Sequence, residues 1–562
     1  MVKKKAILQM LIGNVLYYQI IPMILLGIGL LLFDTYFIPN WIPTDQNIMY
    51  QLLQYTISIG LLSIWLLCCF AMLREKQYKR LTGRSYTKDH NDFQKSFQTL
   101  TKFFSTNDKY RIMEEDLPIE DWHHADGVIL AKYKDRIGSY RLVKRPSSAN
   151  GNLISFGLPG SGKSTTQAAT TAVRFNTDLN PDGCGIFAIS IKGDLLNFVH
   201  GKRKNIKVFT PDREAGSCHY NPLDGIMQMS QTERRSFVET MSQIICPEEQ
   251  GENAAFFVNG ARDYFCAITL YLLYLHDTGK RPGELRFPEI VDSILASNVF
   301  DVTLTIKKSG CKIAGEYSNS YEGSSEKNVS GIYNHLCKSV RPFNNGALRT
   351  LFDGQGNCIT PDFLNYGDIY IDVPQDKYTI YAPAMAIIIT NFLMAFMRRP
   401  DVSSQKEVVP ILFLLDEAVQ LNLDFQILSQ AMSTLRSKKV SLFLLLQSIA
   451  QLEGRYGEAH SREIMDLCAY ISIFNAQDPK SREYFQKLIG KRKMLQKSTS
   501  LSSSETQASS SGISISEINE YIFDAADFGD LNRKTRKSKI EHRVLVYANG
   551  KYILGETTPC YE

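Results

Sequence analysis

The chain has 562 residues, of which 44% are hydrophobic and 22% charged, and its formal net charge is +5. This length exceeds what one ordinary domain needs, and the composition excludes a protein that is disordered throughout. The small net charge does not by itself indicate nucleic-acid binding, and the eleven scattered cysteines include no CxxC pair, which argues against a zinc site and a disulfide framework.

Two apolar segments, residues 11–33 and 52–73, lie near the N-terminus. Neither contains an ionised side chain, and each is long enough to cross ~30 Å of hydrocarbon as a helix. A secretory signal is the alternative for the first segment, but no small-x-small cleavage site follows it and a second span comes soon after. We predict a two-span membrane anchor over residues 1–74, and no later segment is expected to have the length and apolarity of a span.

The charges around these segments predict how the anchor is oriented. Three lysines, Lys3, Lys4 and Lys5, precede the first segment, and a run of Lys and Arg follows the second. The intervening loop, residues 34–51, contains neither. The positive-inside rule therefore places the N-terminus and the long C-terminal part of this multi-pass protein in the cytoplasm.

Residues 75–147 are polar and mixed, and we predict a membrane-proximal linker and small subdomain there. From residue 152 onward, short β-rich runs alternate with helical stretches. The runs are NLISFG, GIFAIS, IKVFT, DIYIDV, VVPILFLLDE, VSLFLLLQ and AYISIFNA. Strands that alternate with helices predict an α/β domain with a parallel sheet, which we assign to residues 148–220 and 342–562.

Residues 221–341 interrupt this alternation. Segments such as ERRSFVETMSQII and ARDYFCAITLYLLYL repeat apolar residues at helical spacing, which predicts a mostly helical insertion. Near the C-terminus, the Ser-rich residues 497–514 are predicted to form a mobile loop. The final RVLVYANGKYILGE predicts a hairpin that turns at Asn549-Gly550.

The stretch FGLPGSGKSTTQ matches the P-loop pattern completely. Its glycines let backbone N–H groups point at phosphates, and the following helix adds its positive end. Lys163 would reach the β- and γ-phosphates, Ser164 would bind Mg²⁺, and Thr165 would bind the α-phosphate. A chance Gly-rich loop is the alternative, but a strand precedes this one and a helix follows. The candidate nucleotide-binding residues are Gly157, Pro159, Gly160, Ser161, Gly162, Lys163, Ser164 and Thr165.

A second acidic motif, LLDE, ends a strongly apolar predicted strand. Asp416 would hold Mg²⁺ through water, and Glu417 would act as the general base that orients the attacking water. The alternative is an acidic helix start that is favoured by the helix dipole. Beside a complete P-loop, the two carboxylates predict ATP hydrolysis with Mg²⁺, and no NKxD-like guanine-reading element stands out.

Two further polar residues stand near the next predicted strand. Gln447 ends VSLFLLLQ, where it could sense the γ-phosphate, or could simply be a polar strand end. Arg436 precedes the same strand, and in a ring it could reach a neighbour's γ-phosphate, or it could be part of an exposed basic turn.

The combined motifs resemble the type IV coupling proteins of bacterial conjugation and type IV secretion, from the spans to about residue 490. The matching elements are the two spans, GLPGSGKS, IKGDLL, HYNPLD, LFLLDE, RSKKVSLFLLLQSIAQLEGRYG and YISIFNAQD. The most specific of them is the LLLQS-x-x-QL-x-x-x-YG signature within the RSKK stretch. The chain departs from the family's usual Asp-Pro-Lys-Gly-Glu after the second strand, because it has Ser-Ile-Lys-Gly-Asp at 190–194. Only Lys192 and Asp194 carry over there.

The resemblance implies a RecA-like and FtsK-like ATPase of the bacterial inner membrane that forms hexamers. It implies that single- or double-stranded DNA, relaxase and relaxosome proteins, and the components of the secretion channel are partners. It also implies that residues 221–341 form an all-α domain that contacts substrate or relaxosome. If the resemblance holds for these positions too, Arg436 is the candidate arginine finger and Gln447 is the candidate sensor of the γ-phosphate.

Two other functions are compatible with these motifs. One is a membrane-anchored, FtsK- or HerA-like DNA translocase for segregation or packaging, although such proteins usually carry more spans and a C-terminal winged helix. The other is a scaffold that binds nucleotide only to assemble, which would not need Glu417. Short basic clusters at 201–207, 436–439, 490–493 and 532–539 are compatible with DNA contact, but such clusters are more often solvated faces.

Overall fold

The computed structural model describes residues 116–118, 125–134, 140–191, 194–248, 252–321, 323–402, 408–504, 507–529, 531, 542–548 and 550–557. All of these belong to one compact unit, Phe103–Glu562. The predicted spans and their flanking charges lie outside the described residues, as do Lys192, the basic cluster at 532–539 and Asn549.

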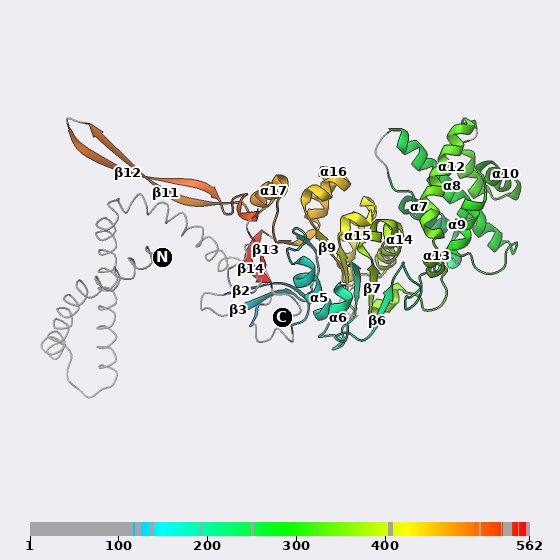
Figure 1. The fold of residues 1–562 in the computed structure, drawn as a ribbon, viewed down its shortest axis with the longest axis horizontal. Helices are drawn as coiled ribbons and strands as arrows, with labels where there is room; N and C mark the ends of the chain where they lie inside the picture. The colour runs from blue at the N-terminus through cyan, green and yellow to red at the C-terminus, as the bar shows by residue number, and fades with distance from the viewer. Residues whose placement is uncertain are drawn as a thin grey trace. The chain divides into compact units, whose positions relative to one another are not determined.

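A twelve-stranded sheet runs through the described chain in the order β1-β3-β2-β14-β13-β10-β4-β9-β8-β5-β7-β6 (Figure 1). Its bounds are β1 Asp116–Pro118, β2 Val128–Lys134, β3 Tyr140–Arg145, β4 Asn152–Phe156, β5 Ile186–Ile191, β6 Ile206–Phe209, β7 Asp368–Val373, β8 Ile411–Asp416, β9 Val440–Leu446, β10 Cys468–Ile473, β13 His542–Ala548 and β14 Lys551–Thr557. From β10 to β6 every pairing is parallel. The predicted parallel α/β sheet is therefore confirmed, strand by strand.

Helices cover both faces of the parallel strands. Their bounds are α5 Ala169–Arg174, α6 Asp194–Val199, α13 Gly346–Leu351, α14 Tyr378–Met397, α15 Phe425–Thr434, α16 Ile449–Asp466 and α17 Pro479–Ile489. Short π or 3₁₀ turns are η3 Lys163–Ala168, η4 Ile226–Gln228, η5 Arg341–Asn344, η6 Pro361–Asn365, η7 Gln375–Lys377, η8 Ala418–Leu421, η9 Leu435–Lys438 and η10 Asp527–Gly529.

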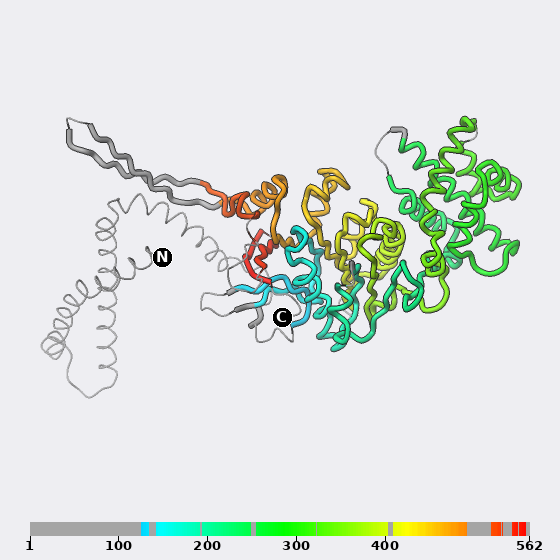
Figure 2. The backbone as a smooth tube through the Cα atoms, in the orientation of Figure 1, coloured from blue at the N-terminus to red at the C-terminus, as the bar shows by residue number. Residues whose placement is uncertain are grey.

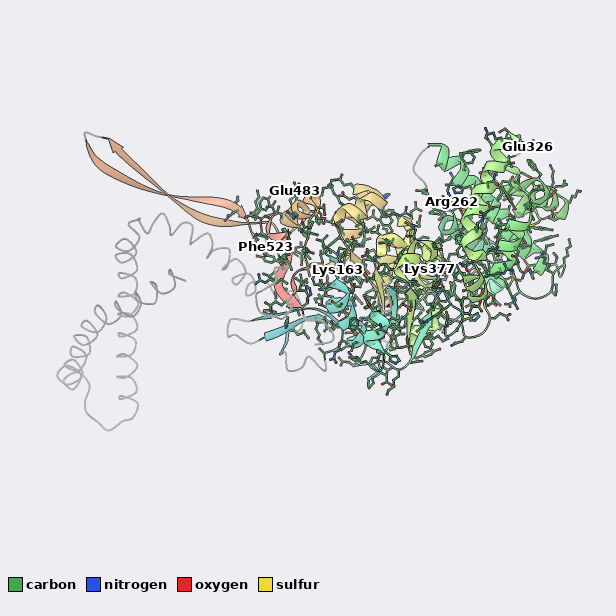
Figure 3. The ribbon with its side chains drawn as sticks, viewed as in Figure 1. Lys163, Arg262, Glu326, Lys377, Glu483 and Phe523 are labelled. Carbon is green, nitrogen blue, oxygen red and sulfur yellow. The ribbon has the colours of Figure 1, made fainter. Side chains whose placement is uncertain are left out.

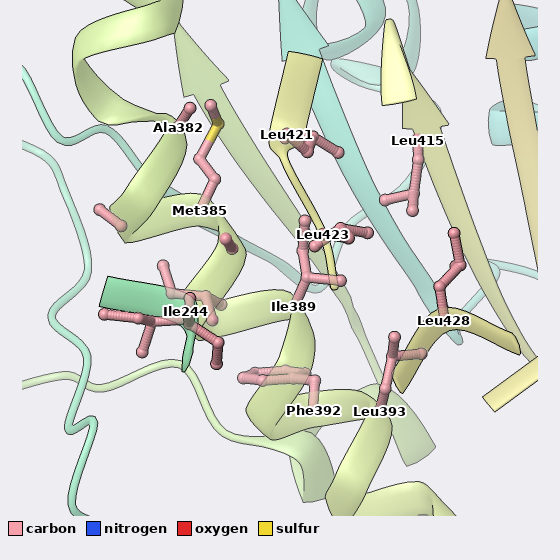
Figure 4. Close-up of a cluster of buried hydrophobic side chains, with 14 of the residues drawn as sticks. Ile244, Ala382, Met385, Ile389, Phe392, Leu393, Leu415, Leu421, Leu423 and Leu428 are labelled. Carbon is pink, nitrogen blue, oxygen red and sulfur yellow. The ribbon is translucent and has the colours of Figure 1, made fainter. Parts of the chain in front are cut away.

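The two faces hold separate apolar cores, because successive side chains along a strand point to opposite sides. Along β4, Ile154 and Phe156 join the core under α14 to α17, whereas Leu153 joins the core under α5 and α6. The first core continues through α14, where Met385, Ile389 and their neighbours pack against residues that follow β8 (Figure 4). Strands that are buried on both faces explain why their sequences read as continuous apolar runs.

The predicted helical insertion is present as a bundle of helices (Figure 1). Its bounds are α7 Gln231–Ile245, α8 Glu252–Asp277, α9 Phe287–Ala296, α10 Val299–Ser309, α11 Lys312–Asn319 and α12 Glu326–Val340. Helix α8 packs against α7, α11 and α12. The first helix starts with a capping box, in which Ser230 and Glu233 each satisfy the other's backbone N–H. The described residues between 221 and 341 form no strand.

Helix α14 overturns one expectation. The segment Gln375–Met397 is long and apolar enough to cross a membrane by length and composition, so the expectation that no later segment has the length and apolarity of a span is wrong. Most of the helix is buried, and it packs on the sheet (Figure 4). A helix that is apolar all round fits a core position as well as a membrane, so composition alone does not separate the two.

The Ser-rich segment was expected to be a loop, and that expectation is wrong. Strands β11 (Lys491–Ser504) and β12 (Gln507–Tyr521) pair as an antiparallel two-stranded sheet along this segment. The prediction rested on the lack of apolar side chains to bury. A hairpin ladder instead pairs backbone N–H and C=O groups, which every serine carries.

The N-terminal strands extend the large sheet. Strands β2 and β3 pair with each other, and β2 joins β14, so a part of residues 75–147 contributes to the same sheet as the P-loop strand. Figure 2 shows this blue segment beside the red C-terminal hairpin. The predicted hairpin of β13 and β14 is confirmed, and Gly550 has the positive φ of 75° that a tight turn favours. The predicted domain boundaries stay predictions.

Candidate nucleotide site

The P-loop connects the carboxyl end of β4 to η3. Gly160 and Gly162 have φ values of 76° and 98°, which glycine adopts without the clash that a side chain would bring. Gly162 is the N-cap of the helical segment that begins at Lys163, and its carbonyl accepts a hydrogen bond from the Thr166 hydroxyl at 2.7 Å. The loop therefore has the backbone curl that the P-loop pattern predicts.

Lys163, which Figure 3 labels, is buried, and its ammonium lies within the loop itself. Its Nζ donates to the carbonyl oxygen of Gly157 and, at 3.4 Å, to that of Leu158. Burial lowers the pKa of Lys163, while the nearby Asp416 and Glu417 act in the opposite direction. The charge is thus held beside the two carboxylates, close to where phosphates would enter.

Ser164 and Asp416 meet directly. The Ser164 hydroxyl donates to Oδ2 of Asp416 at 2.9 Å, because β8 and β4 flank β9 and end at the same edge of the sheet. Burial raises the pKa of Asp416, and the Ser164 hydrogen bond opposes that rise. These two adjacent oxygen ligands suit Mg²⁺, which prefers carboxylate and hydroxyl oxygens.

Glu417 follows Asp416 in a left-handed backbone conformation, with φ 50° and ψ 42°. Such a conformation is uncommon for a residue with a side chain and recurs at functional sites. Nε2 of Gln447 donates to both carboxylate oxygens of Glu417, at 2.9 and 3.0 Å. The structure therefore brings the predicted residues Lys163, Ser164, Asp416, Glu417 and Gln447 together at one edge of the sheet.

Arg436 lies at the other edge. It belongs to η9, before the amino end of β9, is exposed, and lines a cavity of about 460 Å³ together with Gly151 and Asn152. Those two residues stand at the amino end of β4, whereas the P-loop follows its carboxyl end. Within one copy of the described chain, Arg436 therefore does not join the nucleotide site.

Two of the basic clusters, 201–207 and 436–439, each contain a buried residue that stabilises the fold. Arg203 pairs with Asp368, and both side chains are 1% exposed. Lys438 is buried, and its ammonium binds the Arg399 carbonyl at 2.6 Å and Asp401 at 3.0 Å. These two residues are therefore not available for DNA contact. Asp194, carried over from the family resemblance, begins α6 and is exposed.

Three residues near the site were not predicted from the sequence. Oδ1 of Asn475, just after β10, accepts from the Leu158 N–H at 3.0 Å. The Tyr378 hydroxyl donates to the Asp416 carbonyl at 3.1 Å. His542 lies against Gly162. Asn475 could have been predicted, because polar residues that follow parallel strands lie at the ligand-binding edge of the sheet. The positions of Tyr378 and His542 near the site depend on how the elements are arranged in space, which the sequence pattern does not show.

A profile of the family described as type IV secretory system conjugative DNA transfer matches residues 119–535. The chain belongs to this family. It is similar to curated coupling proteins. It is 22% identical over 335 residues to the type IV secretion system-coupling protein VirD4 of Bartonella henselae. This match covers 58% of this chain and 51% of that protein. It is 24% identical over 338 residues to protein VirD4 of Rhizobium radiobacter, with 56% and 46% covered. The chain spans about half the length of the curated relatives it matches.

The fold of this coupling-protein family member is also similar to solved structures. The bacterial conjugative coupling protein TrwBdeltaN70, in its unbound monoclinic form, superposes with a TM-score of 0.57 at 15% identity, over 80% of this chain and 93% of that one. TrwB in complex with the ATP analogue ADPNP superposes with a TM-score of 0.55 at 14% identity, over 82% and 96%. The expected α/β P-loop fold with a helical insertion is confirmed at this level.

Proposed function

We propose that the protein is an ATP-hydrolysing coupling protein that recruits a relaxase–DNA complex or protein effectors and drives them into a type IV secretion channel. The observation that carries this proposal is the convergence of Lys163, Ser164, Asp416 and Glu417 at one sheet edge, in a chain of this family. A P-loop with an acidic strand end beside it is the arrangement that phosphoryl transfer requires.

The substrate is ATP, held by the P-loop backbone and by Lys163. When phosphates enter, the Lys163 ammonium exchanges the Gly157 and Leu158 carbonyls for phosphate oxygens. Ser164 and Asp416 would hold Mg²⁺, which neutralises negative charge on the phosphates. The solved TrwB structures with ADPNP, and with ADP and Mg²⁺, support this choice of ligands.

Hydrolysis is assigned to Glu417 and Gln447. Glu417 takes a proton from the water that attacks the γ-phosphorus, the bond to the bridging oxygen breaks, and ADP leaves with that oxygen. Gln447 senses the γ-phosphate. Its side-chain amide nitrogen binds the Glu417 carboxylate, and this nitrogen would donate to phosphate oxygens instead when ATP is present. The amide then releases the carboxylate that the water needs.

Arg436 acts on a neighbouring subunit of a ring. Its position at the edge opposite its own P-loop suits a side chain that reaches across an interface. An arginine supplied in trans stabilises transition-state charge in related NTPases. The active form in this proposal is a homohexamer, as the family resemblance implies.

The setting of this motor is the bacterial inner membrane. Residues 1–74 anchor it by two spans. Residues 75–147 lead to it and add β2 and β3 to its sheet, and the motor, residues 148–220 and 342–562, lies in the cytoplasm. The all-α insertion, residues 221–341, receives relaxosome proteins or other cargo. DNA, single- or double-stranded, relaxase and channel components are its partners.

The proposal is tested by ATP turnover of the detergent-solubilised full chain, with and without single-stranded and duplex DNA. Wild type is compared with Lys163→Ala and Glu417→Gln. We expect turnover that DNA stimulates in wild type and a loss of at least about 100-fold in both variants. Equal rates in all three proteins would overturn the proposal, and so would turnover only with a nucleotide other than ATP.

A further inference from the structure

The imidazole of His542 occupies the space beside the P-loop that a side chain at residue 162 would need. A Cβ placed on Gly162 would lie 2.8 Å from Cδ2, 2.9 Å from Cγ and 3.1 Å from Nε2 of this ring. The ring therefore packs on the glycine that immediately precedes Lys163. No motif in the sequence points to this residue.

Strand order explains how a residue near the C-terminus reaches the loop. His542 begins β13, which pairs antiparallel with β10, and β10 pairs parallel with β4. The amino end of β13 therefore lies at the same sheet edge as the carboxyl end of β4, where the P-loop starts. The Thr557 hydroxyl, at the end of β14, donates to the His542 carbonyl at 3.2 Å and secures this end of the hairpin.

The site has two distinct flanks. On one side of β4, β9 and β8 carry Gln447, Asp416 and Glu417, the groups assigned to the γ-phosphate, to Mg²⁺ and to the attacking water. On the other side, β10 and β13 carry Asn475 and His542. If the γ-phosphate of bound ATP lies toward Glu417, the nucleoside at the other end of the phosphate chain lies on the opposite side of β4, toward β10 and β13.

We propose that His542 forms part of the nucleoside subsite, where its ring packs against the ribose and base of bound ATP. The side chain is only partly buried, so part of the ring stays accessible beside the loop. Burial lowers the pKa of His542, which keeps the imidazole neutral at neutral pH. A neutral, flat ring suits stacking on a nucleoside better than charge pairing with phosphates. This inference rests on the proposed ATP binding.

The test separates nucleoside contact from support of the loop. Affinities for Mg²⁺-ATP and for Mg²⁺-tripolyphosphate, which has no nucleoside, are measured by calorimetry on the detergent-solubilised full chain. The variants are His542→Ala and His542→Phe, with Lys551→Ala as a control at the far, exposed end of the same hairpin. Thermal unfolding checks that each variant is folded.

We expect His542→Ala to weaken ATP binding about tenfold and to leave tripolyphosphate binding unchanged, because the change removes the aromatic face on which the base stacks. His542→Phe should retain most ATP affinity, and Lys551→Ala should match wild type. Equal weakening of both ligands would show that the ring only supports the loop and would overturn the inference, as would unchanged ATP affinity in His542→Ala. If wild type binds neither ligand, the proposed function itself fails.

Discussion

The side-chain amide of Gln447 donates to both carboxylate oxygens of Glu417, at 2.9 and 3.0 Å. The pair joins the ends of two neighbouring strands, β9 and β8. Glu417 has a left-handed backbone at φ 50°, so its side chain does not follow the direction of the strand before it. The residue assigned to sense the γ-phosphate thus binds the carboxylate assigned as general base directly.

This pairing predicts that Gln447 and Glu417 act as one unit in hydrolysis. Glu417→Gln should lower single-turnover hydrolysis by at least about 100-fold while ATP binding persists, because the general base is lost. Gln447→Ala should also slow it, and the double variant should be no slower than Glu417→Gln alone. Gln420→Ala is the control, since its amide is exposed and contacts the same carboxylate only at 3.5 Å. Additive effects of the two changes would contradict the coupling.

The placement of Arg436 away from its own P-loop predicts complementation between subunits. Arg436→Ala and Lys163→Ala proteins should each be inactive alone. Mixed before assembly, they should recover part of the ATPase activity, because an intact Arg436 can then face an intact Lys163 across an interface. The measurement is turnover against mixing ratio, with a Lys163→Ala, Arg436→Ala double variant as the control partner. No recovery at any ratio would remove Arg436 from the site.

The buried pair of Arg203 and Asp368 predicts a large loss of stability when one partner is removed. Asp368 also accepts from the Ile186 N–H at 2.9 Å, and Arg203 donates to the Phe175 carbonyl at 2.8 Å. Asp368→Asn leaves a buried guanidinium without its counter-charge, at a cost of about 3–5 kcal/mol. We expect the thermal midpoint of the detergent-solubilised chain to fall by at least about 5 °C.

The neighbouring pair of Lys204 and Asp182 provides the control, because their side chains are 77% and 42% exposed. Lys204→Ala should cost about 0–1 kcal/mol, as exposed ion pairs do. Similar shifts for Lys204→Ala and Asp368→Asn would contradict the assignment of stability to burial.

The lowered pKa of His542 predicts a pH-dependent loss of stability. Burial holds it below the ordinary value of 6.5. Above that value the ring is neutral in both the folded and the unfolded chain and contributes no pH dependence. As the pH falls below it, the unfolded ring binds a proton that the folded ring resists, so the free energy of unfolding decreases. Between pH 7.5 and 5.5, wild type should lose more thermal stability than His542→Gln. An equal loss in both proteins would argue against a shifted histidine.

The sequence by itself determined the core of the candidate nucleotide site. The motif GLPGSGKS predicts the conformation of the P-loop, because the glycines, the lysine and the serine that define it all lie within one short loop. Asp416 and Glu417 were predictable because an apolar strand that ends in carboxylates marks the ligand edge of a parallel sheet. The long helical periodicity of residues 221–341 predicted a helical insertion for the same local reason.

Tertiary structure alone decided which residues surround that site. The order β13-β10-β4-β9-β8 brings His542 to Gly162 and Gln447 to Glu417, and it leaves Arg436 at the opposite edge. Burial of Arg203 against Asp368, and of α14 against the sheet, likewise depends on what packs around them. Periodicity and motif spacing report how a residue relates to its neighbours along the chain. Strand order and burial depend on contacts between residues hundreds of positions apart, which no local pattern records.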